Sequence, residues 1–165
     1  MIFLTVGTQE PFDRLVAAVD DWAAAHDTPI FGQLGALKPD SYRPKHFEWR
    51  DFISADDYQR RLEASDLLVA HVGMGSIISA LTFGKPLVMM ARRAALGEHR
   101  NEHQLATAAR FEGRAGLHIA AEAADVGPLI DRVQASGGDG AAAGLSPYAA
   151  PELIETLKSF IHAGR

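Results

Sequence analysis

A glycine-interrupted turn between a buried strand and an apolar helix constrains this chain more than any other feature. The apolar run Asp66–Ala70 leads into the turn His71–Ser76, and apolar residues then recur at helical spacing. A strand that passes directly into a helix brings backbone N–H groups together at the helix N-terminus. Such a point binds phosphate without a metal ion. The turn therefore predicts a strand, a helix and an anion site between them.

Strand and helix patterns alternate along the rest of the chain. Short apolar runs predict strands at residues 2–6, 29–33, 46–52, 66–70, 87–90 and 116–120. Apolar residues at helical spacing predict helices at residues 12–23, 55–64, 75–84, 101–111 and 126–133. Because strands that alternate with helices build parallel sheets, we expect a Rossmann-like α/β fold with helices on both faces of the sheet.

The length and composition fit a single domain over residues 1–165. The chain is 47% hydrophobic, which is enough for one core, and it is too short for two ordinary domains. A stretch rich in glycine and alanine predicts a mobile loop at about 136–146, and a last helix is expected at about 151–161. In that helix Leu157, Phe160 and Ile161 are candidates for docking another chain, with packing inside the domain as an equal alternative.

Charge and cysteine content exclude several classes of protein. The formal net charge of -5, with no basic stripe, argues against nucleic-acid binding. The absence of cysteine excludes a disulfide scaffold and thiol chemistry, and it fits a cytoplasmic location. The first residues carry no basic leader and no long apolar stretch follows, so we expect neither a signal peptide nor a membrane span. The acidic pairs Asp20–Asp21 and Asp56–Asp57 are interpreted as surface charge.

Familiar catalytic fingerprints are missing. The chain has no Gly-x-Ser-x-Gly elbow, no Walker loop and no Gly-x-Gly-x-x-Gly motif. Hydrolase, P-loop and NAD-binding functions are therefore disfavoured.

Three loops are expected at one edge of the sheet, where ligands of open parallel sheets bind. They are Gly7–Gln9 after the first strand, His71–Gly75 after the fourth and Arg92–His103 after the fifth. Together they offer room for a diphosphate. Gly73 and Gly75 let backbone approach a ligand without a Cβ, while the nearby Ser76 hydroxyl can donate to an oxygen; a plain turn and helix cap is the alternative.

The third loop supplies groups suited to a sugar. Glu98, Asn101 and Gln104 can bind hydroxyls, and His99 can donate a hydrogen bond. His99 and His103 are four residues apart, so zinc is a second possibility, although no third ligand lies nearby in sequence. We favour sugar or phosphate contact, with no metal.

Two further groups near these loops have open interpretations. Arg92 and Arg93 can neutralise a diphosphate, but an arginine pair after a strand is equally often a solvated edge. His71 can be a general base, or it can be held by backbone hydrogen bonds and shape the turn. We favour the structural role for His71.

These motifs carry a resemblance that covers nearly the whole chain. The start Phe3–Leu15, the turn His71–Ser76 and the segment Gly97–Gln104 resemble the C-terminal, donor-binding domain of family 28 glycosyltransferases of the GT-B class. The opening residues are similar to soluble subunits of two-subunit UDP-N-acetylglucosamine transferases, and still more to bacterial exopolysaccharide relatives. The resemblance implies that this chain is one GT-B half-domain.

The resemblance also implies roles for individual residues. In the family, the first glycine turn lies against the donor diphosphate, a role that falls here on Gly7, Thr8 and, more weakly, Gln9. The turn that contains Met74 matches the family's phosphate-binding turn. The segment around Asp51–Ile53 matches the place where relatives contact uracil, which makes Phe52 and Ile53 candidates.

Two more implications concern the ribose and the sugar. Asn101 and Gln104 match amide side chains that hold the donor sugar. Many relatives hold the ribose hydroxyls with a glutamate three residues after the serine of the turn, and this chain has Ser79 there. A serine can bind one hydroxyl but cannot clamp a diol as a carboxylate does.

The function implied by the resemblance is that of a donor-binding subunit in an inverting, metal-independent UDP-sugar glycosyltransferase. The acceptor domain of a full GT-B enzyme is missing, so a membrane-anchored partner is expected to bring a lipid-linked acceptor. The setting is exopolysaccharide or lipid-linked glycan synthesis, in the cytoplasm at the inner face of the membrane. The alternative is a homodimeric sensor that binds a nucleotide or nucleotide sugar without catalysis; half of a sugar-nucleotide epimerase is less favoured.

Overall fold

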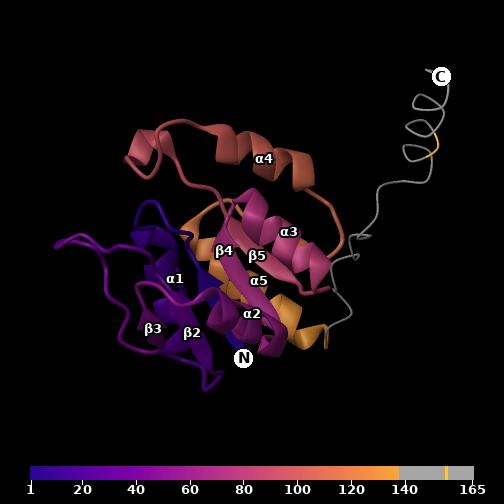
Figure 1. The fold of residues 1–165 in the computed structure, drawn as a ribbon, viewed down its shortest axis with the longest axis horizontal. Coiled ribbons are helices and arrows are strands. Elements are labelled where there is room, and N and C mark those ends of the chain that lie inside the picture. The colour runs from indigo at the N-terminus through magenta and orange to yellow at the C-terminus, as the bar shows by residue number, and fades with distance from the viewer. Residues whose placement is uncertain (138–154, 156–165) are drawn as a thin grey trace, which may run out of the picture.

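Six strands and five α-helices lie within residues 1–137 of the computed structural model, which describes those residues and residue 155, and they alternate except where β3 follows β2 directly (Figure 1). The strands are β1 (Ile2–Thr5), β2 (Ile30–Gln33), β3 (Glu48–Arg50), β4 (Leu67–His71), β5 (Leu87–Met90) and β6 (Leu117–Ala120). The helices are α1 (Asp13–Ala23), α2 (Ala55–Ala64), α3 (Met74–Thr82), α4 (His103–Phe111) and α5 (Val126–Ala135), with short 3₁₀ turns η1 (Ala94–Leu96) and η2 (Ala123–Asp125).

The strands form one fully parallel sheet in the order β3-β2-β1-β4-β5-β6. This confirms the Rossmann-like α/β fold that the sequence predicts. Among the boundaries that differ from the prediction, β3, expected over 46–52, covers only Glu48–Arg50, and α4, expected from Asn101, begins at His103. The preceding residues have no helical hydrogen bonding, so His99 and His103 do not share a helix face as the zinc alternative assumed.

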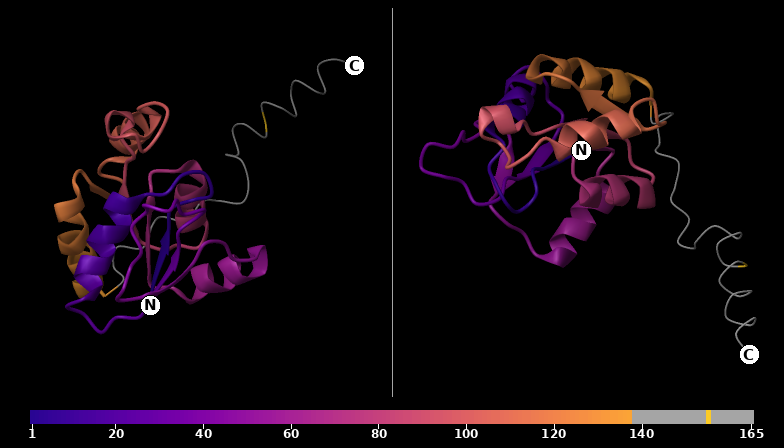
Figure 2. Two further views of the ribbon diagram at one scale, coloured as in Figure 1. Left: turned by 90° about the vertical axis from the view of Figure 1, so that its left-hand side faces the viewer. Right: turned by 90° about the horizontal axis from the view of Figure 1, so that it is seen from above.

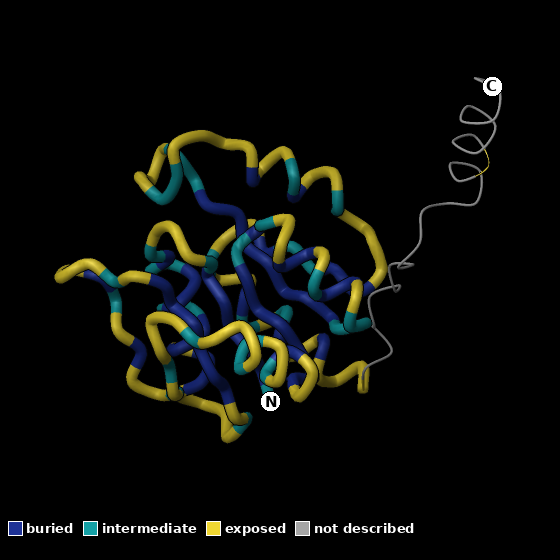
Figure 3. The backbone as a smooth tube through the Cα atoms, viewed as in Figure 1, coloured by how far each residue is buried: buried dark blue, intermediate teal, exposed yellow. Residues whose placement is uncertain are grey.

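Helices cover both faces of the sheet, and alternate residues of each strand feed two cores. Ile2 and Leu4 face the core under α1 and α5, whereas Phe3 faces the core under α2, α3 and α4. The two helical layers are seen on opposite sides of the sheet in Figure 2, and buried segments gather at the centre of the molecule in Figure 3. This alternation is the period of two that a β-strand imposes.

The order in which the chain adds strands to the sheet reverses between the two central strands, β1 and β4. From β1 the chain proceeds to β2 and β3 on one side, and from β4 it proceeds to β5 and β6 on the other. The loops after β1 and β4 therefore diverge at the sheet edge and leave a crevice between them. These loops contain Gly7 and Gly73, which the sequence singled out.

Asp20 is an exception to its interpretation as surface charge. It lies on α1 with only 1% of its surface exposed, and its carboxylate anchors the loop between β2 and β3. The backbone N–H groups of Lys45 and His46 donate to it at 3.0 and 2.8 Å, and the Tyr42 hydroxyl donates at 2.7 Å. Burial alone raises the pKa of Asp20, but these donors outweigh burial and lower it. Asp21, by contrast, is exposed.

Replacing Asp20 with asparagine is expected to lower the free energy of unfolding by about 2–3 kcal/mol, because an amide N–H₂ then faces N–H donors. The lowered pKa of Asp20 adds stability above its unfolded pKa of about 4, and that stability is lost as the pH falls through the folded value. The free energy of unfolding of the variant should therefore fall less than that of the wild-type protein when the pH is lowered from 7 to 4. Urea denaturation at pH 7 and pH 4 measures both effects. Asp21→Asn is the matched control, and equal stability of the two variants would contradict this role for Asp20.

No helix in the described residues is long and apolar enough to cross a membrane. The docking candidates Leu157, Phe160 and Ile161, and most of the loop predicted at about 136–146, lie outside the described residues.

Candidate functional site

A pocket of about 700 Å³ opens at the carboxyl ends of β1 and β4. The loops after β1, β3, β4 and β5 and the first turns of α2 and α3 surround it, so it lies at the reversal point of the sheet. Most of the predicted site residues line it: Gly7, Thr8, Phe52, Ile53, Gly73, Met74, Gly75, Ser76, Ser79, Arg92, His99 and Gln104. Glu98 and Asn101 do not. The pocket brings together loops that are far apart in sequence.

The N-terminus of α3 forms one wall of the pocket. Gly73 is its N-cap and has no side chain to cap the first N–H groups, so those of Met74, Gly75 and Ser76 have no partner within the helix. A Cβ on Gly75 would meet no atom within 4 Å, which means that open space adjoins the turn. Free N–H groups and the positive end of the helix dipole suit this wall to an anion.

The imidazole of His71 lies between the two glycine loops. A Cβ added to Gly7 would come within 2.9 Å of the ring, and one added to Gly73 within 2.3 Å. Gly7 also has a left-handed φ of 81°, which favours glycine. The ring therefore requires glycine on both sides and shapes the turn, as the sequence suggested.

His71 differs from its predicted role in two respects. It lines the pocket, and its Nδ1 is buried without a hydrogen-bond partner in the described part of the chain. Burial, followed by the charge of Arg92, lowers the pKa of His71 to about 4. The ring is therefore neutral at pH 7 and presents an uncharged surface to a ligand.

The buried side chain of Arg92 connects the loop after β5 to the loop after β1. It is 3% exposed, and its guanidinium donates to the carbonyls of Val6 at 2.8 Å, Glu10 at 2.6 Å and Pro11 at 2.6 Å. A fourth, longer bond of 3.4 Å reaches the Glu98 carbonyl. The terminal N–H groups that would contact a diphosphate are thus used within the protein. Burial lowers the pKa of Arg92 to about 10, so it still carries its charge at pH 7.

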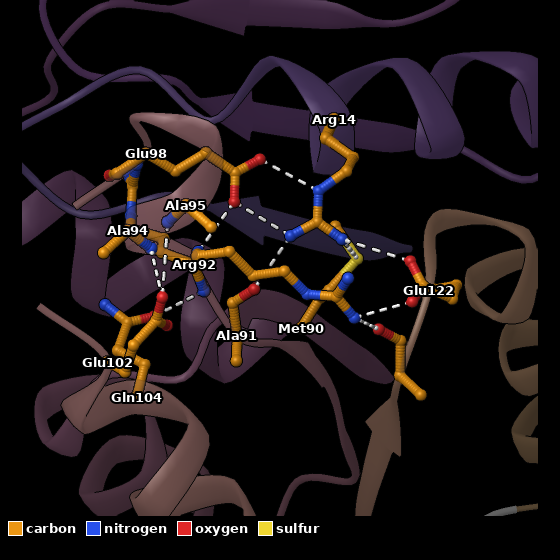
Figure 4. A network of polar contacts seen from close by, with 12 residues as sticks. Arg14, Met90, Ala91, Arg92, Ala94, Ala95, Glu98, Glu102, Gln104 and Glu122 are labelled. Atoms are coloured by element: carbon orange, nitrogen blue, oxygen red, sulfur yellow. Dashed lines mark hydrogen bonds and ion pairs between the residues drawn. The ribbon is translucent and has the colours of Figure 1, made fainter.

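Glu98 is a correction to the sequence prediction. Its carboxylate does not face the pocket; it accepts two hydrogen bonds from Arg14 on α1, at 2.9 and 2.8 Å, and one from the Arg93 N–H at 2.9 Å (Figure 4). Burial alone raises the pKa of Glu98, but these donors lower it. With its oxygens engaged, Glu98 holds the loop after β5 against α1 and is not placed to bind a sugar hydroxyl.

The neighbouring arginine has its own partners. Arg93 donates to the Ala121 carbonyl at 2.9 Å and to Glu122 at 2.6 Å, so it joins the loop after β5 to the one after β6. Neither Arg93 nor Glu122 lines the pocket. The alternative of a solvated edge therefore fits Arg93, which is about one-third exposed, but not Arg92.

Gln104 is the amide best placed for a ligand in this loop. It is 3% exposed, and its Oε1 accepts the Arg92 backbone N–H at 3.0 Å, which leaves its side-chain N–H₂ as a donor beside the pocket. Asn101 is exposed, and its side-chain oxygen contacts His103. His99 and His103 line the pocket, and their rings meet edge to face with centroids 4.6 Å apart. Among the described residues no three histidine or acidic side chains are grouped as metal ligands.

The loop after β3 forms the far end of the pocket. Phe52 is half exposed there, and the peptide groups of Phe52 and Ile53 make no hydrogen bond within the described residues. An unpaired peptide edge beside an aromatic ring can hydrogen-bond the edge of a planar base. The lining residues that the sequence analysis did not select include Thr5, Gln33 and Tyr58. Tyr58 is four residues before the buried Leu62, and this spacing is the signal that it faces inward.

Comparisons with known proteins agree with this architecture. The model of the glycosyltransferase family 28 C-terminal domain matches residues 1–135. The UDP-N-acetylglucosamine transferase subunit ALG13 of Mus musculus is 31% identical over 108 residues, which are 61% of this chain and 9% of that protein. The Homo sapiens protein of the same name is 28% identical over 109 residues. The chain spans about a tenth of the length of these relatives.

Solved structures share the fold at low identity. The solution structure of ALG13 has a TM-score of 0.56 at 19% identity and covers 94% of this chain and 93% of its own. MurG of Acinetobacter baumannii has a TM-score of 0.56 at 17% identity, and the match covers 80% of this chain and 40% of MurG. The spinosyn forosaminyltransferase SpnP reaches 0.63 at 14% identity, covering 96% and 43%. These likenesses establish the fold alone.

Proposed function

We propose that this chain is the donor-binding subunit of a UDP-sugar glycosyltransferase. It belongs to glycosyltransferase family 28, because the model of that family's C-terminal domain matches residues 1–135. The observation that carries this proposal is the uncapped N-terminus of α3, which faces a pocket with a peptide edge at one end and Gln104 at the other. A base at Phe52 and Ile53, a diphosphate at α3 and a sugar at Gln104 would follow one another as they do in a nucleotide sugar.

The chemistry we propose is an inverting displacement. The acceptor hydroxyl attacks the anomeric carbon while the bond from that carbon to the diphosphate oxygen breaks. Negative charge then grows on the departing UDP, and the first N–H groups of α3 and its dipole stabilise that charge. The buried charge of Arg92 beside the pocket adds to this field. No metal ion is assigned a part in the reaction.

We propose that the acceptor and the base that takes its proton come from a partner subunit. The curated relatives are named as subunits of a transferase, which supports such an arrangement here. The partner would be membrane-anchored and carry a lipid-linked acceptor, and the complex would act at the cytoplasmic face in exopolysaccharide or lipid-linked glycan synthesis.

Titration calorimetry of the purified chain with UDP, GDP and ADP in EDTA tests the proposal. We expect binding of UDP in preference to the purine nucleotides, and tighter binding of one UDP-sugar from a panel. Absence of UDP binding, with or without the partner, would contradict the proposal. A stable dimer that binds nucleotide yet transfers no sugar even with the partner would favour the sensor instead.

One substitution distinguishes contacts to the sugar from contacts to the nucleotide. Gln104→Ala is expected to weaken the preferred UDP-sugar by about tenfold relative to UDP, because one hydrogen bond to the sugar is lost. Asn101→Ala is the comparison, since Asn101 is expected from the family resemblance to bind sugar but is absent from the pocket lining. A larger sugar-specific loss in Asn101→Ala than in Gln104→Ala would mean that the loop closes differently around the donor.

A further inference from the structure

We propose that the Tyr58 hydroxyl recognises the ribose of the donor, acting with Ser79 in place of a carboxylate. This inference rests on the proposed function, because it assigns a further specificity residue to the same nucleotide site. Three hydroxyl-bearing side chains of the pocket lining come from three different elements, and the Tyr58 hydroxyl interacts with the other two. Thr5 ends β1, Tyr58 lies in the first half of α2 and Ser79 lies in α3.

The position of this hydroxyl group follows from the order of parts in a nucleotide. The ribose joins the base to the diphosphate, so residues between the base end and the phosphate end of the pocket must face it. Ser79 follows Ser76 by three residues, which places it on the same side of α3 about one turn further from the phosphate wall. Tyr58 follows the loop of Phe52 and Ile53 along α2. Both therefore lie between the two ends.

The Tyr58 ring is held in place before any ligand arrives. It packs edge-on against the fully buried Phe3, with ring centroids 5.2 Å apart and planes at 69°. Burial raises the pKa of Tyr58, whereas the nearby side chains of Ser79 and Thr5 oppose that rise. The hydroxyl thus stays protonated at pH 7 and lies beside the other two hydroxyls, ready to donate and accept.

No carboxylate is available for the same task. Among the described residues that line the pocket, Glu10 alone is acidic, and its carboxylate pairs with Lys38 Nζ at 2.9 Å on an exposed part of the rim. Ribose hydroxyls both donate and accept, and so do those of tyrosine and serine. A neutral hydroxyl pair binds the diol less tightly than a carboxylate, so the chain should distinguish ribose from deoxyribose only modestly.

The test compares UDP with 2′-deoxy-UDP and 3′-deoxy-UDP on the full chain by calorimetry. One of the two deoxy analogues should bind the wild-type protein more weakly than the other. The ratio of its Kd to that of UDP should be about three to ten, as expected for one or two neutral hydrogen bonds. Tyr58→Phe keeps the ring packed on Phe3 and should bring that ratio close to one, mainly by weakening UDP. Ser79→Ala should reduce the ratio partly.

Tyr42→Phe is the matched control, because it also removes a tyrosine hydroxyl but one that contacts Asp20, outside the pocket. It should leave the ratio unchanged. Normal UDP binding with the wild-type ratio in Tyr58→Phe would overturn this inference and leave the proposed function standing. Failure of the wild-type chain to bind UDP in any form, alone or with the partner, would overturn both.

Discussion

Replacing Arg92 with methionine is expected to cost about 3 kcal/mol of folding free energy and to weaken UDP binding by about tenfold or more. The physical reason is that the buried guanidinium supplies the donors for the Val6, Glu10 and Pro11 carbonyls, which methionine leaves unpaired. The loop after β1 then loses its tie to the loop after β5, and two walls of the pocket separate. Urea denaturation and UDP titration measure the two effects.

The adjacent arginine provides the control. Arg93→Met removes the same charge from the next residue, but the Arg93 side chain is partly exposed, and its hydrogen bonds among the described residues reach only the loop after β6. Its loss should cost less than about 1 kcal/mol and leave UDP affinity unchanged. Arg92→Lys keeps the charge yet cannot reach several carbonyls at once, so it should resemble Arg92→Met in stability. Wild-type stability in Arg92→Lys would show that charge alone matters.

Replacing Gly73 with alanine is the second substitution with a large expected effect. The backbone of Gly73 is extended, with φ of -117°, so alanine fits its conformation. The added Cβ would nevertheless lie 2.3 Å from the His71 ring, which cannot retreat because Gly7 lies against it. We expect the free energy of unfolding to fall by about 1–3 kcal/mol, since the ring or the turn must move. We also expect UDP binding to become undetectable, because that movement is into the pocket.

Two variants test that explanation. Gly75→Ala lies two residues away, where a Cβ meets nothing within 4 Å, and alanine in a helix should raise stability slightly. It should still weaken UDP binding if the diphosphate lies against this turn. His71→Ala combined with Gly73→Ala removes the clash and should recover most of the stability lost in Gly73→Ala. If the double variant is no more stable than the single one, the His71 contact is not the cause.

Local patterns in the sequence were sufficient for the fold. The strands appear as short apolar runs and the helices as apolar residues at helical spacing, and the order of elements then implies a parallel sheet. The turn after β4 could also be identified, because Gly73 to Ser76 connect a strand directly to a helix. The start of α4 was placed too early because the residues from Asn101 have helical composition but no cap that fixes the boundary.

The roles of charged residues could not be obtained in this way. Glu98 looked like a sugar ligand by its position in a polar loop, yet its partner Arg14 is 84 residues earlier in the chain. The sequence left Arg92 open between a diphosphate ligand and a solvated edge, and only the assembled sheet shows carbonyls from a distant loop around its guanidinium. The role of Asp20 was missed for the same reason, because its hydrogen-bond donors lie more than twenty residues later in the chain. Pairings between distant elements leave no local pattern.

The register of the two central strands bears on when this molecule becomes a folded protein during its synthesis. Ile2 pairs with Leu67, so β1 leaves the ribosome before its neighbour β4, and the hydrogen bond from Arg92 to Val6 forms only after β5 has followed. Until then the apolar β1 lacks one of its two neighbours, an arrangement that folds slowly and invites aggregation. Because the pocket lies between these strands, a nucleotide that binds there can stabilise only the nearly finished domain. Under the proposed function, the supply of the nucleotide sugar would then influence how much of this chain reaches its folded state during synthesis.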